Sequence, residues 1–173
     1  MKVRNRKGVY VIIGLLLVIL GVAVPGGFVA RGEEGAAVKP LIAVFTLEDL
    51  RASDETKGLG EDVAASITDG LAKVESVKVV ERKELKKILD EIGLTMTGAV
   101  DETTALRVGK LLGANRLALG SFMKFGDKVR INVRLIKTET GEVLCTARVT
   151  GDFNDIFELE EDLVKQMVAT GLK

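Results

Sequence analysis

Residues 79–122 read VVERKELKKILDEIGLTMTGAVDETTALRVGKLLGANRLALGSF and contain the most informative signals for the fold. It begins at the end of a short apolar strand. Apolar residues at helical spacing then predict a charged helix over 81–91, which Gly93 is placed to end. Asp101 is the expected N-cap of the next helix, and an apolar run from residue 116 follows that helix. The stretch therefore predicts strand, helix, helix and strand.

The residues before this stretch predict a βαβ unit. Residues 41–45, LIAVF, form an apolar run of strand length, and residues 46–57 are polar and predict a loop. Apolar residues at a spacing of four predict a helix from about residue 60 to 73, and VKVV, residues 77–80, is a second short strand. Two strands joined by one helix are expected to be parallel and right-handed in their crossover.

The residues after this stretch predict an antiparallel meander. Strands are expected over 116–125, 128–137 and 143–151, with a hairpin turn at Gly126-Asp127 and another over 139–142. Apolar residues alternate with polar ones along the last two strands, so one face is expected to be buried. The expected inward-facing residues are Val129, Ile131, Val133, Leu135, Val143, Cys145, Ala147 and Val149.

A last helix completes the chain, with Asp155 and Glu158 spaced as a capping box. The expected order is β-α-β-α-α-β-β-β-α, a mixed sheet packed with helices, in the α/β (mixed α+β) class. The expected domain organisation is an N-terminal signal anchor or signal peptide over 1–30, a linker over 31–40 and one folded domain over 41–173.

The first 30 residues predict a membrane segment. Residues 8–24 carry no charge, and basic residues precede them. This length lies between a signal-peptide core and a spanning helix, so a retained anchor and a cleaved signal peptide both stay open. The one-sided positive charge favours an N-in orientation, which would place the folded domain outside the cytoplasm in either case.

The composition argues against several classes of function. There is no histidine and one cysteine, so the commonest general base and metal ligand are missing. Four basic residues and no acid lie in residues 1–30, and the rest of the 25 basic and 25 acidic side chains leave a net charge of −4 beyond them. We therefore expect no enzyme activity, no cofactor, no metal, no nucleic acid and no small-molecule substrate.

Arginines on the predicted hairpin are the candidate site. Arg130, Arg134 and Arg148 are expected to share its polar face, with Lys124 as a further candidate. Such a face is often simply solvated and paired across strands. The functional alternative is a docking surface for an acidic partner or anionic headgroups.

Other polar groups have structural explanations. The motif Gly58-Leu59-Gly60 lacks the spacing of a phosphate loop and predicts a turn and helix start, and the acids of residues 152–158 do not match a calcium loop. Cys145 is expected to be a small core residue. Arg82 and Glu91 bracket one helix, where they could form a structural ion pair or part of a subunit contact.

The ordered set of motifs over 79–122 resembles the CsgG-like family, which includes FlgO-like and LpoB-like envelope proteins and is related to the N-terminal domain of TolB. Residues 42–45 are similar to that family's first strand, 58–60 to its first helix start and 140–144 to its last hairpin. The resemblance implies a cell-envelope protein without catalytic residues that associates with itself, as a homo-oligomer, or with partner proteins.

This sequence differs from the family's curli exporter in two respects. The family's curli exporter is a lipoprotein with two long hairpins that build a barrel, whereas this sequence has no lipobox cysteine and only short inter-strand loops. We therefore expect a binding or assembly module of the periplasm or cell envelope, attached through residues 8–24. The alternatives are a subunit of a curli-type secretion complex and, less favoured by composition, an enzyme.

Overall fold

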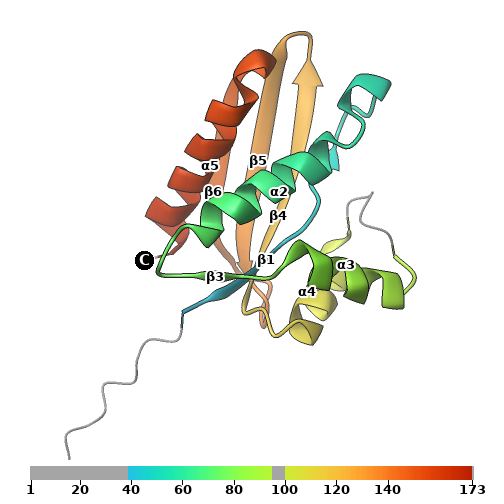
Figure 1. Cartoon of the computed structure of the whole chain (residues 1–173), viewed down its shortest axis with the longest axis vertical. Helices are drawn as coiled ribbons and strands as arrows, with labels where there is room; N and C mark the ends of the chain where they lie inside the picture. The colour runs from blue at the N-terminus through green and yellow to red at the C-terminus, as the bar shows by residue number, and fades with distance from the viewer. Residues whose placement is uncertain (1–38, 95–99, 173) are drawn as a thin grey trace, which may run out of the picture. The chain divides into compact units, whose positions relative to one another are not determined.

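A mixed β-sheet forms the centre of the computed structural model, which describes residues 39–94 and 100–172 (Figure 1). The strands lie in the order β3-β1-β4-β5-β6, and β2 pairs with β4 beyond the end of β1. The pairings of β1 with β3 and of β1 and β2 with β4 are parallel, and those of β4 with β5 and of β5 with β6 are antiparallel. The strands are β1 (Leu41–Val44), β2 (Glu48–Asp49), β3 (Lys78–Val79), β4 (Arg116–Phe125), β5 (Lys128–Lys137) and β6 (Val143–Asp152).

Helices connect and cover these strands, and the mixed α/β fold expected from the sequence is confirmed. The β1-α2-β3 segment is the parallel βαβ unit that the sequence predicts. Asp101 caps α4 as predicted, because its side chain accepts a hydrogen bond from the backbone N–H of Thr104. The helical segments are the 3-10 turn η1 (Asp54–Thr56), α2 (Leu59–Ala72), α3 (Arg82–Glu91), α4 (Glu102–Leu111), the 3-10 turn η2 (Phe153–Asp155) and α5 (Ile156–Gly171).

Each face of the sheet has its own hydrophobic core. Helices α2 and α5 cover one face along its length, and α3 and α4 pack on the other face. The first core includes Ile67, Leu71, Phe122, Ile131, Leu135, Leu163 and Met167. The second core includes Phe45, Leu85, Leu89, Ala105, Val108, Leu117, Leu119 and Ile136.

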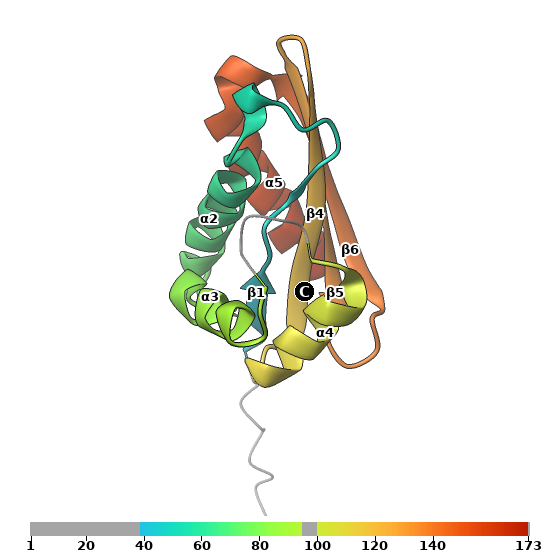
Figure 2. The same cartoon turned by 90° about the vertical axis from the view of Figure 1, so that its right-hand side faces the viewer.

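The second core covers only part of its face. From β4 and β5 it takes just Leu117, Leu119 and Ile136, which lie near the start of β4 and the end of β5. Closer to the hairpin that joins β4 and β5, Arg130 and Arg134 of β5 lie on this same face and are exposed. Figure 2 shows α2 and α5 on one side of the long strands and, among the described residues, no helix beside the upper part of their other side. We call this uncovered area the open half of the sheet.

The loop predicted over residues 46–57 is wrong in part, since it contains β2 and η1. Gly60 explains this local structure. A Cβ atom on Gly60 would lie 2.2 Å from the backbone oxygen of Leu47, so the absence of a side chain lets the start of α2 approach the β1–β2 connection. The backbone N–H of Leu47 donates to the oxygen of Gly60 at 3.2 Å, which fixes that approach.

The predicted capping box at the start of α5 is also wrong. Asp155 makes no side-chain cap hydrogen bond, and its backbone lies at φ −98° and ψ 22° instead of in the extended region that a capping residue adopts. The 3-10 turn η2 precedes α5, and Asp152 caps that turn by accepting from the N–H of Asn154 at 3.1 Å. The helical turn therefore starts earlier than the residue spacing suggested.

Val143 is not an inward-facing residue of the first core, contrary to the predicted alternation. The register shifts at Leu135/Ile136, so that Cys145 lies opposite Leu135 but Val143 lies opposite Ile136. Because opposed residues project from the same face, this irregularity turns Val143 away from the first core and leaves it 48% exposed. Cys145 is buried, as predicted.

The predicted membrane segment over residues 8–24 lies outside the described residues. Within residues 39–94 and 100–172, no helix has both the length and the apolar character needed to cross a membrane.

Candidate functional site

The strand register brings three arginines together on the open half of the sheet. Asn132 of β5 lies between Arg130 and Arg134 on the same face, and Arg148 of β6 lies directly opposite Asn132. All three arginines are exposed. We call Arg130, Asn132, Arg134 and Arg148 the arginine face.

The three arginines differ in their partners. Arg148 Nε donates to Asn132 Oδ1 at 2.7 Å, and Arg130 Nε donates to Thr150 Oγ1 at 3.4 Å. Arg134 Nη2 lies 3.3 Å from Glu102 Oε2, as an ion pair with α4. Among the described residues, Arg134 is thus the one member of the arginine face with a carboxylate partner.

Lys124 does not belong to this face, which corrects the sequence-based grouping. It lies opposite Val129, a residue of the first core, and therefore projects from the opposite face of the sheet. There its Nζ lies 3.0 Å from Glu55 Oε1 and 5.0 Å from the centre of the Phe153 ring. The sequence placed Lys124 near the arginines, but its even position on β4 pairs it with the odd, inward-facing positions of β5.

A pocket of about 390 Å³ lies between the arginine face and the start of α4. Asp101 in its wall caps α4 with its carboxylate. Hydrogen bonds with Thr104 lower the pKa of this exposed carboxyl, and burial opposes that shift. Glu102 is the acid that reaches the arginine face. The lining residues are Phe45, Thr46, Glu48, Val100, Asp101, Glu102, Leu119, Gly120, Ser121, Asn132, Arg134, Thr146 and Arg148.

Sequence reasoning missed Glu102 as part of this site. It is 32 residues from Arg134 in the chain and comes from a helix that packs on the second core. No spacing pattern marks such a pair, because only the docking of α4 against β4 brings the two side chains together.

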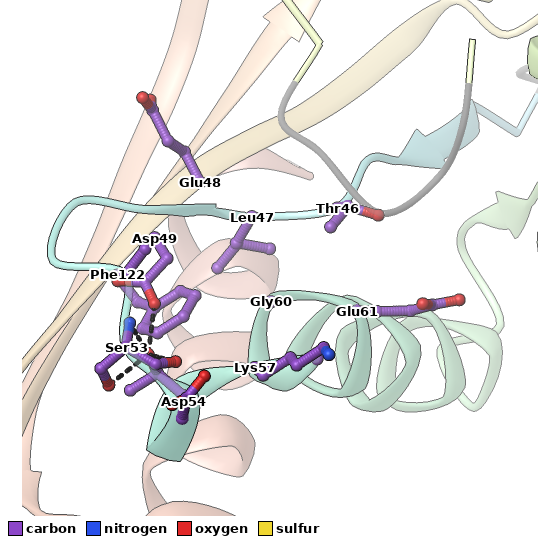
Figure 3. Close-up of a pocket in the computed structure, with 13 residues that line it drawn as sticks. Thr46, Leu47, Glu48, Asp49, Ser53, Asp54, Lys57, Gly60, Glu61 and Phe122 are labelled. Carbon is purple, nitrogen blue, oxygen red and sulfur yellow. Dashed lines mark hydrogen bonds between the residues drawn. The ribbon is translucent and has the colours of Figure 1, made fainter.

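A larger open cleft of about 1000 Å³ lies between the β1–β2 connection, η1 and the start of α2 (Figure 3). At one end Thr56 Oγ1 donates to Asp49 Oδ2 at 2.5 Å, and the backbone N–H of Ser53 donates to Thr56 Oγ1 at 3.1 Å. Figure 3 shows Lys57 and Glu61 on the α2 side, away from this cluster. The hydroxyl of Ser53 lies 3.0 Å from that of Thr56. The Asp49 carboxylate and these two hydroxyls are thus engaged in hydrogen bonds within the connection.

Glu61, which lines this cleft, also takes part in an ion pair. Arg82 at the start of α3 places Nη2 3.6 Å from Glu61 Oε1, and its Nη1 donates to the backbone oxygen of Val44 at 3.5 Å. Arg82 therefore joins the ends of α2, α3 and β1. Its ionic partner is Glu61, which corrects the suggested pairing with Glu91.

The glycine motif and the acidic residues singled out in the sequence have structural roles. Gly58 immediately precedes α2 and adopts φ +85°, a backbone conformation that glycine tolerates well. The predicted turn and helix start are therefore confirmed. Within the described part of the chain, no three acidic or cysteine side chains are grouped closely enough to hold a metal ion. The arginine face is an exposed, polar surface on the open half of the sheet.

Comparisons with known proteins agree with this fold. The C-terminal domain of LpoB from Escherichia coli is 14% identical, with a TM-score of 0.55 over 70% of this chain and 89% of that domain. Lipoprotein GNA1162 from Neisseria meningitidis is 14% identical, with a TM-score of 0.52 over 75% of this chain and 98% of that protein. At such identities these likenesses concern the fold.

Two sequence comparisons add to this. A protein described as putative adenylate cyclase 3, from Rhizobium meliloti, is 22% identical over 144 residues, and the chain spans 23% of its length. The profile of the family described as curli production assembly/transport component CsgG matches residues 28–130. This match supports an envelope protein with a binding or assembly role, located outside the cytoplasm. Since the matched residues make up more than half of the 173, the chain belongs to the CsgG family.

Proposed function

We propose that this chain is a non-catalytic binding and assembly module of the cell envelope, whose partner docks on the arginine face. The observation that carries the proposal is the open half of the sheet, where Arg130 and Arg148 are exposed and pair with neutral groups, Thr150 and Asn132. A guanidinium held by a neutral side chain keeps its charge available, and arginine is enriched at protein interfaces.

The rest of the surface supports this choice. The first face of the sheet is covered by α2 and α5, so it offers no strand surface to a partner. The folded part carries a net negative charge, yet these three arginines gather on one face of two neighbouring strands. A local excess of one charge on an otherwise acidic domain favours association with acidic surfaces.

Site-specific photo-crosslinking in the native host tests this function. A photoreactive residue in place of Thr150, beside the arginine face, should give discrete adducts. The same residue in place of Arg107, on the exposed side of α4, is the matched control. Adducts that appear from Thr150, and that weaken in the Arg130→Gln/Arg148→Gln variant, support the proposal. Identical adducts from both positions, or none from Thr150, contradict it.

The subunit of a curli-type secretion or assembly complex is a second candidate, which the family description favours. The native mass of the full chain in a non-ionic detergent, measured by light scattering, separates the two. A ring-sized oligomer supports the secretion complex, and a monomer supports a tethered adaptor. In both cases we propose that residues 8–24 hold the folded domain at the membrane.

A further inference from the structure

We infer that the arginine face binds an extended acidic segment of a partner protein, and that Glu102 competes with this segment for Arg134. The inference rests on the proposed function and names the chemistry of the partner. In the free protein, the carboxylate of Glu102 then occupies the place that one carboxylate of the partner would take, with its Oε2 3.3 Å from Arg134 Nη2.

The spacing of the arginine face matches an extended chain. Arg130, Asn132 and Arg134 follow each other at every second residue of β5, and Arg148 lies opposite the middle position. Side chains two residues apart on a strand are separated by about 6.8 Å. Along the strand direction the positive groups therefore follow each other at about that step, with Arg148 displaced by about 4.8 Å to the neighbouring strand. An extended segment has the same repeat, so acidic residues at alternate positions would meet the face in register.

Hydrogen-bonding groups in the pocket suit carboxylates. The hydroxyls of Ser121 and Thr146 line the pocket beside Arg148, and Leu119 and Phe45 provide apolar walls. The carboxylate of Asp101 caps α4, where its Oδ1 accepts from the N–H of Thr104 at 3.0 Å. Glu48 and Glu102 are the other acids of the wall, and of these Glu102 is the one that is paired with an arginine.

The competition follows from the exposure of the ion pair. The Arg134 and Glu102 side chains are 49% and 44% exposed, so the pair is solvent-screened and weak. An acidic segment that also contacts Arg130 and Arg148 gains several charge-assisted contacts at once, whereas Glu102 makes one. Displacement of Glu102 is therefore expected on binding, and its removal should strengthen binding.

Fluorescence anisotropy with labelled peptides tests the inference on the full chain in a non-ionic detergent. The probe is the octapeptide ESESESES, compared with EEEESSSS, which has the same charge in another pattern. We expect ESESESES to bind more tightly at about 50 mM salt, where the screening length is about 14 Å. We expect Glu102→Gln to tighten its binding by about two- to fivefold, the range that loss of one exposed competing ion pair allows.

Two controls separate competition from a general change in charge. Glu142→Gln removes one exposed acid at the β5–β6 turn and should leave the affinity nearly unchanged. In an Arg134→Gln background, Glu102→Gln should have little effect, because the group for which it competes is gone. Arg148→Gln should weaken binding in every background.

The inference is overturned if ESESESES does not bind, if EEEESSSS binds equally well, or if Glu102→Gln and Glu142→Gln have the same effect. Each of these results leaves the crosslinking test of the proposed function untouched. The absence of adducts from position 150 when Arg130 and Arg148 are both intact would instead contradict the proposed function, whatever the peptides do.

Discussion

Arg82 of α3 lies 3.6 Å from Glu61 of α2 and also reaches the backbone oxygen of Val44 in β1, so one side chain joins three elements. The side chain of Arg82 is 21% exposed and that of Glu61 is 48% exposed. Burial lowers the pKa of the Arg82 guanidinium, and the neighbouring Glu61 opposes that effect. Arg82 is thus the more buried partner and depends on Glu61 for its counter-charge.

We predict that Glu61→Gln lowers the free energy of unfolding by about 1–2 kcal/mol, since it leaves a partly buried arginine without its carboxylate. Urea denaturation followed by circular dichroism measures this. Glu84→Gln, an exposed acid in the first turn of α3, is the control and should change stability by less than about 0.5 kcal/mol. Equal effects of the two variants would show that the ion pair contributes nothing.

Glu160 predicts a pH dependence of stability. It is 7% exposed on α5 and faces Ser66 and Asp62 of α2; burial raises the pKa of its carboxyl, Ser66 opposes that shift and Asp62 adds to it. A group with a raised pKa in the folded state costs stability as the pH rises above its ordinary value of 4.5, because the folded state resists its ionisation.

We therefore expect Glu160→Gln to raise the urea midpoint at pH 7.5 and to leave it nearly unchanged below pH 4, where Glu160 is protonated in both states. Glu161→Gln on the exposed side of α5 is the control. A gain at pH 7.5 that persists in full at acid pH would mean that the ionisation of Glu160 is not its cause.

The glycines at the start of α2 should differ in their tolerance of alanine. A Cβ on Gly60 would meet the backbone oxygen of Leu47 at 2.2 Å, which requires the β1–β2 connection to move. A Cβ on Gly58 would meet no atom within 4 Å, but its φ of +85° is unfavourable for alanine. We expect losses of about 2–4 kcal/mol for Gly60→Ala and about 1 kcal/mol for Gly58→Ala.

Thermal unfolding measures both changes. Gly58→Asn is a further check, because asparagine tolerates positive φ better than alanine and should be less destabilising. If Gly58→Ala proved the more harmful of the two alanine variants, backbone conformation and not close approach would dominate at this helix start.

Lys124 tests whether the partner's binding is confined to the arginine face. Because it projects from the face opposite the arginines, Lys124→Gln should leave the Thr150 crosslinks and the ESESESES affinity unchanged. It should lower stability by at most about 1 kcal/mol through the loss of its contacts with Glu55 and Phe153. A loss of binding as large as that of Arg148→Gln would mean that docking is not confined to the arginine face.

Most helices and strands of the fold could be predicted from the sequence, because the patterns that mark them lie within short stretches of the chain. The spacing of apolar residues located α2, α3, α4 and α5, and alternation located the strands of the meander with their hairpin turns. The two-residue alternation also placed Arg130, Arg134 and Arg148 on one face, since side chains of a strand project to alternate sides.

The class of fold, the family resemblance and the face on which the three arginines lie could be predicted from the sequence, because they follow from local periodicity and ordered motifs. Four features became visible only in the folded chain. They are the position of Lys124 on the other face, the exposure of Val143, and the ion pairs of Arg134 with Glu102 and of Arg82 with Glu61. These depend on strand register and helix docking, which bring together residues far apart in the chain, and no local pattern encodes such distances.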